Sequence, residues 1–195
     1  METDKKLNIT ENHLMVLMLF TNGYSKEYYI REVYNNLNIG VRTAKRILDG
    51  LERKGILTSN IKGNIRVFRT QKNQIARDYF TLTEQYKKIL FLQKNSLIAQ
   101  IVEKITPFID GIGILFGSYV KGNADEESDL DICIVGECNR SELQKISKIY
   151  NISINIFHYS YKLFDKDIFK DHLLKEVIQN HIIITQPDQF IMRIL

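Results

Sequence analysis

Apolar residues recur at helical spacing through the first third of the chain, and two short apolar runs follow them. The helical spacing predicts three helices, over His13 to Phe20, Lys26 to Leu37 and Val41 to Lys54. The runs Ile56-Leu57 and Ile65 to Arg69 predict two strands, with a turn from Ser59 to Asn64 between them. This part of the chain is therefore expected to fold as three helices and a hairpin.

The middle of the chain is helical in pattern. Gln71 to Asp78 is polar and indicates a connection, and Tyr79 to Thr106 has mostly helical composition. Its second half carries a clean amphipathic face that ends at Pro107, because proline cannot continue a helix. The first half has a less regular apolar face, over Tyr79 to Leu92, without an obvious partner within the chain. We therefore expect this face to form a domain boundary or a homodimer contact.

The remaining residues alternate between short apolar strands and amphipathic helices. The expected strands are Ile112 to Phe116, Leu130 to Val135, Ile152 to Phe157 and His181 to Thr185. The expected helices run from Ser141 to Tyr150, with a capping box at Ser141, and through Phe169 to Ile178. The loop between strand and capping box is expected at Gly136 to Arg140, and the apolar tail Phe190 to Leu195 should dock on the sheet or on a second subunit. The predicted fold class is α+β, with units at 1–70, 71–94 (a helical connector) and 95–195.

One stretch in the third unit carries candidate chemistry. An apolar strand ends at Gly117 and Ser118, and a spacer of ten residues leads to Asp129-Leu130-Asp131 within the next strand. Glycine allows a ligand to approach the backbone, and a serine at the start of a helical turn suits phosphate oxygens. Side chains alternate along a strand, so Asp129 and Asp131 share one face. Mg²⁺ favours a few carboxylates together with substrate phosphates, so the pair is expected to ligate Mg²⁺.

These residues resemble the signature of the nucleotidyltransferase superfamily, which includes DNA polymerase beta and the minimal nucleotidyltransferases. The resemblance covers about 110 to 136 and implies transfer of a nucleoside monophosphate from an NTP, with ATP the expected one, to an acceptor hydroxyl. It implies that Asp129 and Asp131 are catalytic and bind Mg²⁺. The residues that it implies for nucleotide binding are Gly117, Ser118, Lys121 and Ser128. Lys121 stands where arginine is usual in the family.

The third strand departs from the family pattern. Many nucleotidyltransferases carry a third carboxylate there, which is expected to act as general base. Here Ser153 and Asn155 occupy that face, and neither accepts a proton near neutral pH. The departure predicts retained nucleotide binding with weak turnover. Five later side chains are candidates to replace the base, although their spacing singles out none of them: His158, Asp165, Asp167, Asp171 and His172.

Positive charge is concentrated in the first third. The net charge of the whole chain is +4, but residues 1–72 carry +6 (13 basic and 7 acidic side chains) and residues 73–195 carry −2 (14 and 16). This asymmetry indicates a polyanionic partner for the first third. The segment Thr43 to Leu57 resembles the recognition helix and wing entry of MarR- and ArsR-like winged helix-turn-helix regulators. The resemblance implies duplex DNA binding, with the third helix in the major groove and a basic wing on the phosphates. The expected DNA-binding residues are Arg42, Thr43, Lys45 and Arg46 on the helix and Lys62 and Arg66 on the wing.

Composition excludes several other classes of protein. The apolar fraction of 44% is ordinary for a globular protein, and the longest apolar run is far too short for a membrane span. Two cysteines, Cys133 and Cys138, are too few for a disulfide framework and favour a reducing, cytoplasmic environment. A metal site that combines them with His158 is the alternative to two idle thiols. The polar beginning of the chain lacks the pattern of a signal peptide.

Two functions remain open on the sequence alone. In the first, the protein is an active nucleotidyltransferase whose acceptor is bound near the basic unit; the acceptor can be a protein, since minimal nucleotidyltransferases can act as antitoxins that modify a partner toxin. In the second, the protein is a DNA-binding regulator whose nucleotidyltransferase-like unit binds nucleotide but is weak or inactive. A homodimer is expected in either case, because winged helices commonly read two-fold related half-sites.

Overall fold

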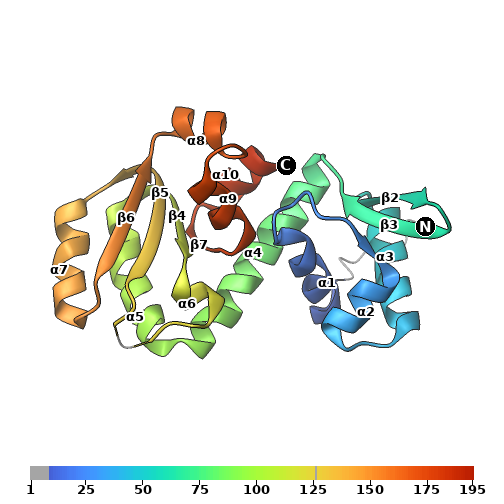
Figure 1. Cartoon of the computed structure of the whole chain (residues 1–195), viewed down its shortest axis with the longest axis horizontal. Helices are drawn as coiled ribbons and strands as arrows, with labels where there is room; N and C mark the ends of the chain where they lie inside the picture. Colours follow the sequence, from blue (N-terminus) through green and yellow to red (C-terminus); the bar gives the residue numbers. More distant parts are fainter. Residues whose placement is uncertain (1–8, 126) are drawn as a thin grey trace, which may run out of the picture.

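The computed structural model describes residues 9–125 and 127–195, and the predicted α+β class is confirmed (Figure 1). The N-terminal part contains helices α1 (Glu11–Thr21), α2 (Ile30–Leu37) and α3 (Val41–Arg53). Its sheet is antiparallel, in the order β1-β3-β2, and consists of β1 (Tyr28–Tyr29), β2 (Leu57–Lys62) and β3 (Ile65–Thr70). The predicted order of three helices followed by a hairpin is therefore present, with one additional strand.

Strand pairing corrects two of the predicted boundaries in this part. Helix α2 begins at Ile30 instead of Lys26, because Tyr28 and Tyr29 pair with β3 and so adopt an extended backbone. The hairpin strands pair as far as Lys62 opposite Ile65, so most of the turn predicted from Ser59 onward is strand. Cross-strand pairing, which a short polar segment does not reveal, decided both boundaries.

The middle of the chain forms two consecutive helices, α4 (Gln74–Lys94) and α5 (Ser96–Ile105). The polar segment predicted as a connection is therefore mostly the first turn of α4. Asn73 caps this helix, since its side chain accepts a hydrogen bond of 2.8 Å from the Ala76 N–H. A short 3₁₀ turn, η1 (Thr106–Phe108), follows α5 and contains the proline that ends the helical pattern.

The C-terminal part is built on a mixed four-stranded sheet in the order β6-β5-β4-β7. Its strands are β4 (Ile109–Phe116), β5 (Leu130–Cys138), β6 (Ile154–Tyr159) and β7 (Ile182–Thr185). Strands β5 and β6 run parallel, while β4 pairs antiparallel with both of its neighbours. The helices are α6 (Ser118–Lys121), α7 (Arg140–Tyr150), α8 (Tyr161–Asp167), α9 (His172–Gln179) and α10 (Pro187–Ile194).

Several boundaries in this part differ from the sequence prediction; β4 begins at Ile109 instead of Ile112, and β6 covers Ile154–Tyr159 instead of Ile152 to Phe157. Strand β5 continues to Cys138 through most of the predicted loop, because Ile109 of β4 extends far enough to pair with it. The cap of α7 is Asn139, whose side chain accepts from the Glu142 N–H, and not Ser141. The apolar tail does dock, but as helix α10, with Phe190 and Ile191 fully buried.

Helices cover both faces of this sheet. Leu130, Ile132 and Ile134 of β5 are fully buried on the face covered by α5 and α7. The intervening residues of β5 face α8, α9 and α10 on the other side. The alternation predicted for this strand is therefore present, and it assigns Asp129 and Asp131 to the second face.

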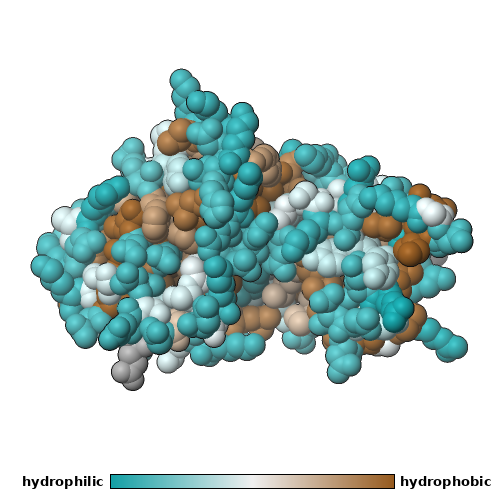
Figure 2. All heavy atoms as spheres, in the orientation of Figure 1, coloured by the Kyte–Doolittle hydropathy of each residue, from teal (hydrophilic) through white to brown (hydrophobic). Residues whose placement is uncertain are grey.

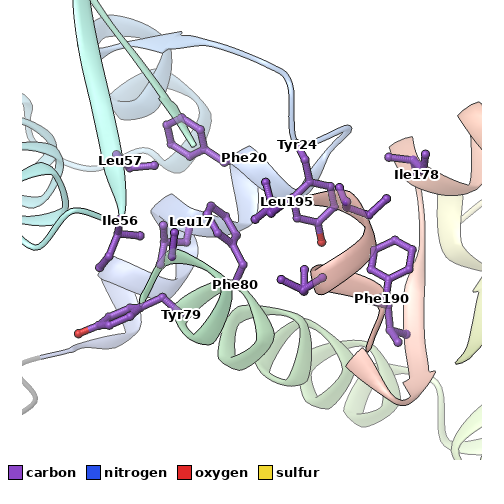
Figure 3. Close-up of a cluster of buried hydrophobic side chains, with 14 of the residues drawn as sticks. Leu17, Phe20, Tyr24, Ile56, Leu57, Tyr79, Phe80, Ile178, Phe190 and Leu195 are labelled. Carbon is purple, nitrogen blue, oxygen red and sulfur yellow. The ribbon is translucent and has the colours of Figure 1, made fainter. Parts of the chain in front are cut away.

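The long helix α4 joins the two parts, because it packs against α1 on one side and against α10 and β7 on the other. One apolar cluster continues across the junction, where Tyr24, Phe80, Phe190 and Leu195 meet (Figure 3). The domain limits at 70 and 95 stay a prediction.

A buried polar cluster lies at the same junction. Glu84 of α4 is fully buried and accepts a hydrogen bond of 2.5 Å from the Tyr24 hydroxyl, while His181 lies 3.2 Å from the same carboxylate oxygen. Lys87 lies 2.7 Å from the other oxygen of Glu84 and donates to the Thr21 hydroxyl at 3.2 Å. These groups come from both parts of the chain, so the cluster holds the two parts in one arrangement.

The surface is mostly polar, with scattered apolar groups (Figure 2). One group lies at the tip of the β2–β3 hairpin, where Ile61 is 76% exposed. Another follows α4, where Ile75, Leu82 and Ile89 are exposed at a spacing of seven residues. Within the described residues, none of the helices has the length and apolar character needed to cross a membrane.

Candidate active site

Two carboxylates and one amide meet at the ends of three neighbouring strands. Asp131 of β5 is in register with Phe116 at the end of β4 and with Asn155 at the start of β6. The Asn155 side-chain amide donates to Asp129 Oδ2 at 3.0 Å and to Asp131 Oδ1 at 3.1 Å. A single amide group therefore contacts both acids, so their oxygens converge on one point.

The surroundings of Asp131 disfavour its charge. Partial burial raises the pKa of Asp131, the hydrogen bond from Asn155 lowers it, and the negative charges of Asp129 and Glu176 raise it again. The net shift is upward, because two further acids lie near a half-buried carboxylate. A cation placed between the two aspartates would remove this penalty.

The turn after β4 lies directly against the Asp131 carboxylate. Gly117 has a φ of +76°, in the left-handed region, and a Cβ atom added there would collide with Asp131 Oδ2. Glycine is therefore required both by the backbone conformation and by the lack of space. Helix α6 begins at Ser118, and the first N–H groups of a helical turn have no partner within the turn. This arrangement leaves backbone donors beside the two acids.

Two of the predicted nucleotide-binding side chains have partners within the protein. Lys121 Nζ lies 2.5 Å from Glu176 Oε1, an acid on α9 that sequence reasoning missed. The Ser128 hydroxyl donates to Asp125 Oδ1 at 2.7 Å and accepts from the Asp125 N–H at 2.9 Å, so it closes the turn before β5. No sequence signal marks Glu176, because tertiary packing of α9 on β4 brings it to the site.

Three of the candidate substitutes for the missing base, His158, Asp165 and Asp171, have other partners. Asp171 caps α9 through a hydrogen bond of 2.9 Å from the Leu174 N–H, and Asp165 lies 3.5 Å from Arg193. Asp167 lies at the end of α8, and His172 is an exposed residue at the start of α9. None of these contacts involves the aspartate pair.

The two cysteines do not form a metal site with His158. Cys133 is buried, and burial raises the pKa of its thiol to about 12, while His158 Nε2 lies 2.5 Å from the Gly136 carbonyl oxygen. Across residues 9–125 and 127–195, no group of three or more histidine, cysteine, aspartate or glutamate side chains is arranged to hold a metal ion.

The donor set at Asp129 and Asp131 nevertheless fits a hard cation. Mg²⁺ is commonly held by one or two carboxylates together with phosphate oxygens of a substrate. The two converging carboxylates supply the first kind of ligand, and the exposed Asp129 leaves the site open to the second. The residues present therefore suit a cation that arrives with a phosphorylated ligand better than one held by protein alone.

A separate basic surface lies on α3. Arg42, Lys45, Arg46 and Arg53 are exposed there. Partial burial lowers the pKa of the nearby His13, and the positive charges of Lys54 and Arg46 lower it further. The two wing residues form ion pairs within the protein. Lys62 pairs with Glu27. Arg66 pairs with two acids of α3, Asp49 at 2.7 Å and Glu52.

Comparison with known proteins identifies the family. Two similar proteins of Methanocaldococcus jannaschii are both named "Putative protein adenylyltransferase". One is 40% identical over 70 residues, which cover 32% of this chain and 70% of that protein. The other is 32% identical over 71 residues, which cover 36% of this chain and 52% of that protein. A family model described as "Nucleotidyltransferase domain" matches residues 83–185, more than half of the chain, and the chain therefore belongs to the nucleotidyltransferase family.

Proposed function

We propose that the protein transfers the adenylyl group of ATP to a hydroxyl group of another protein. The observation that carries the proposal is the convergence of Asp129 and Asp131 on one Asn155 amide, directly beside the Gly117 turn. The family supports the class of reaction, and the names of the two relatives support adenylyl transfer to protein.

Each residue has a distinct role in this proposal. Asp129 and Asp131 hold Mg²⁺, which supplies charge neutralisation at the phosphates. The backbone N–H groups after Gly117 bind phosphate oxygens, as the N-terminal end of a helical turn does. Lys121 reaches the triphosphate as a point charge after it leaves Glu176. Ser128 holds the turn before β5 in shape through Asp125.

The transfer forms a bond between the acceptor oxygen and the α-phosphorus, and it breaks the bond from that phosphorus to pyrophosphate. The acceptor hydroxyl must also lose its proton. Asn155 occupies the position where a base is expected and accepts no proton, so the proton passes to water or to a group of the acceptor protein. Loss of a general base costs about 10²–10⁴-fold in rate, so transfer is expected to be slow.

Calorimetry with Mg²⁺ and a non-hydrolysable ATP analogue tests the site. Asp129→Asn and Asp131→Asn should each weaken binding of the Mg²⁺ complex at least tenfold, because each removes a charged ligand. Asp110→Asn changes an exposed acid at the far end of β4 and is the matched control, with binding unchanged. If the double variant at 129 and 131 binds like wild type, the nucleotide site lies elsewhere.

We also propose that the N-terminal part is a winged helix that binds duplex DNA through α3. Four exposed cations on one helix favour this second function, since a helix fits the major groove and cations neutralise phosphates. Because Arg66 is held by acids of α3, we assign it to bracing the wing against that helix and assign the phosphate contacts mainly to Arg42, Lys45 and Arg46. Combined with slow adenylyl transfer, DNA binding would make the protein a regulator that also binds nucleotide.

Filter binding of duplex DNA across salt concentrations tests this second function. Each neutralised phosphate contributes a slope of about −0.9 to the log–log plot. Replacing Arg42, Lys45 and Arg46 by glutamine should lower affinity and flatten the slope by two to three such increments. The matched control replaces Lys104, Lys145 and Lys148, three lysines of α5 and α7, and should change neither. Absence of DNA retention by wild type at low salt would exclude the function.

A further inference from the structure

The two edges of the four-stranded sheet differ in protection. Strand β7 forms one edge, has only four residues and is packed by α4. Its Thr185 hydroxyl donates to the Gly111 carbonyl at 2.7 Å, which fastens the end of the strand. Strand β6 forms the other edge, has six residues, and in the described part of the chain pairs only with β5.

The backbone groups on the free side of β6 can be identified from the register. Leu130 is the partner of Ile154, and its N–H donates to the Ser153 carbonyl at 2.8 Å. In a parallel ladder, alternate residues direct both backbone groups toward the neighbouring strand. Asn155 and Phe157 therefore face β5, while the N–H and C=O groups of Ile154, Ile156 and His158 point outward. Only the Ile154 carbonyl has a side-chain partner among the hydrogen bonds of the described residues, Gln144 at 3.5 Å.

The composition of β6 leaves this edge available for pairing. Proteins commonly block an edge strand with lysine, proline or another charged side chain, because free backbone groups are a template for a further strand. Strand β6 reads Ile-Asn-Ile-Phe-His-Tyr and contains neither proline nor an acidic, lysine or arginine residue. Figure 2 shows apolar side chains at the surface in the region of β5 and β6.

The same edge adjoins the candidate active site. Phe116, Asp131 and Asn155 form one row across β4, β5 and β6, with Asp131 and Asn155 directed to the same face. A strand added beside β6 would lie about 4.8 Å away and would place one residue next in this row. The side chain of that residue would share the face of the two aspartates, one strand spacing beyond the Asn155 amide.

We propose that the acceptor protein docks as an extended segment that adds a strand to β6, with its modified hydroxyl side chain opposite Asn155. The proposal rests on the proposed function, since it names how that reaction receives its acceptor. Main-chain hydrogen bonds to Ile156 and His158 supply affinity, as in other cases of strand addition. The segment's hydroxyl oxygen then bonds to the α-phosphorus of ATP as pyrophosphate leaves.

The test compares Ile156→Pro with Ile156→Ala in the full chain. Proline removes the outward N–H of residue 156 without removing a bond to β5, and such a position tolerates proline. Alanine removes the same side-chain packing but keeps the N–H, so it is the matched control. The probes are soluble seven-residue peptides of alternating valine and glutamine with a central tyrosine, serine or threonine. The readouts are labelling by α-³²P-ATP, amide hydrogen exchange at residues 156 and 158, and calorimetry with the Mg²⁺–ATP analogue.

We expect at least one peptide to be labelled and to slow exchange of the outward amides of Ile156 and His158. Ile156→Pro should lower labelling at least tenfold relative to Ile156→Ala, while both variants bind the Mg²⁺–ATP analogue like wild type. Equal labelling of the two variants, or analogue binding without any peptide labelling or protection, overturns the docking proposal and leaves the nucleotide site intact. Loss of analogue binding by wild type overturns the proposed function instead. Sedimentation equilibrium that shows a dimer abolished by Ile156→Pro would assign the edge to a second copy of the chain and also overturn the proposal.

Discussion

Asn155 is the residue at which a single change reports on the whole candidate site. Its amide donates to Asp129 and Asp131 at 3.0 and 3.1 Å, so in the absence of a cation it supplies the positive dipole that the two acids share. Asn155→Asp replaces that donor with a third negative charge at nearly constant volume. The protein without Mg²⁺ should therefore lose stability, while its affinity for Mg²⁺ should rise.

The expected loss can be worked from these contacts. Hydrogen bonds to charged groups contribute about 1.5–3 kcal/mol to stability when buried. The two hydrogen bonds of Asn155 are partly exposed, so we take their contribution to be about 1.5 kcal/mol or less. Two like charges about 4 Å apart cost about 1 kcal/mol in water and about 4 kcal/mol near a protein surface. Together these contributions predict a loss of about 3 kcal/mol in the free energy of unfolding. For a chain of this size the loss corresponds to a fall in Tm of roughly 6–12 °C.

Thermal unfolding in EDTA and in millimolar Mg²⁺ measures the effect. Asn155→Ala is the control, since it removes the donor without adding charge and should show a smaller loss, of which Mg²⁺ recovers less than in Asn155→Asp. In Asn155→Asp, Mg²⁺ should recover about 1.4 kcal/mol for each tenfold gain in its affinity. Pyrophosphate release with a competent acceptor should also rise, by up to about 10²-fold, if the new acid serves as base.

Three results would refute parts of this reasoning. If Asn155→Asp unfolds in EDTA at the temperature of wild type, the three side chains do not share one site. If its loss is the same in Mg²⁺ as in EDTA, the three acids at positions 129, 131 and 155 do not share a cation. A wild-type enzyme that already transfers rapidly, and that Asn155→Asp slows, would show that the base lies elsewhere.

Three further predictions concern the site, the junction and the α4 surface. Gly117→Ala should abolish binding of the Mg²⁺–ATP analogue and destabilise the protein, because its Cβ collides with Asp131 at a left-handed φ; calorimetry with Gly122→Ala, also at a positive φ but with open space around it, is the control. Burial, and then the charge of Lys87, lower the pKa of His181. The free energy of unfolding is therefore unaffected by this group above pH 6.5, and it falls by up to about 1.4 kcal/mol per pH unit below that value. Urea unfolding should show that His181→Gln removes this fall, whereas the same replacement at the exposed His172 leaves it. Leu82→Lys should convert a dimer to the 22.9 kDa monomer in sedimentation equilibrium, and a wild-type monomer at tens of micromolar would end the dimer prediction.

The junction cluster adds a second acid-sensitive step. Burial alone would raise the pKa of Glu84, but the positive charges of Lys87 and His181 outweigh it and hold the pKa at about 2. A depressed pKa stabilises the folded state above the ordinary value of 4.5, and this stabilisation is lost as pH falls from 4.5 toward 2. The junction is therefore expected to lose stability in acid in two stages, first as His181 and then as Glu84 takes up a proton.

Local sequence determined the elements and the acidic pair. Alternation in Asp129-Leu130-Asp131 is a property of any strand, so burial of Leu130 on one side fixed the direction of both acids. The Gly117 turn followed in the same way, because the backbone conformation needed there is one that only glycine adopts without strain. These inferences depend on neighbours within a few residues, which the sequence displays directly.

Only the tertiary structure decided which distant groups meet. Glu176 approaches Lys121 because α9 packs on the sheet, and Tyr24 reaches Glu84 because α4 lies between the two parts of the chain. The sequence marked Arg66 as a wing cation for DNA, yet folding turned it toward the acids of α3. Such pairings depend on the relative placement of whole elements, and that placement is set by core packing summed over many residues, which no local pattern contains.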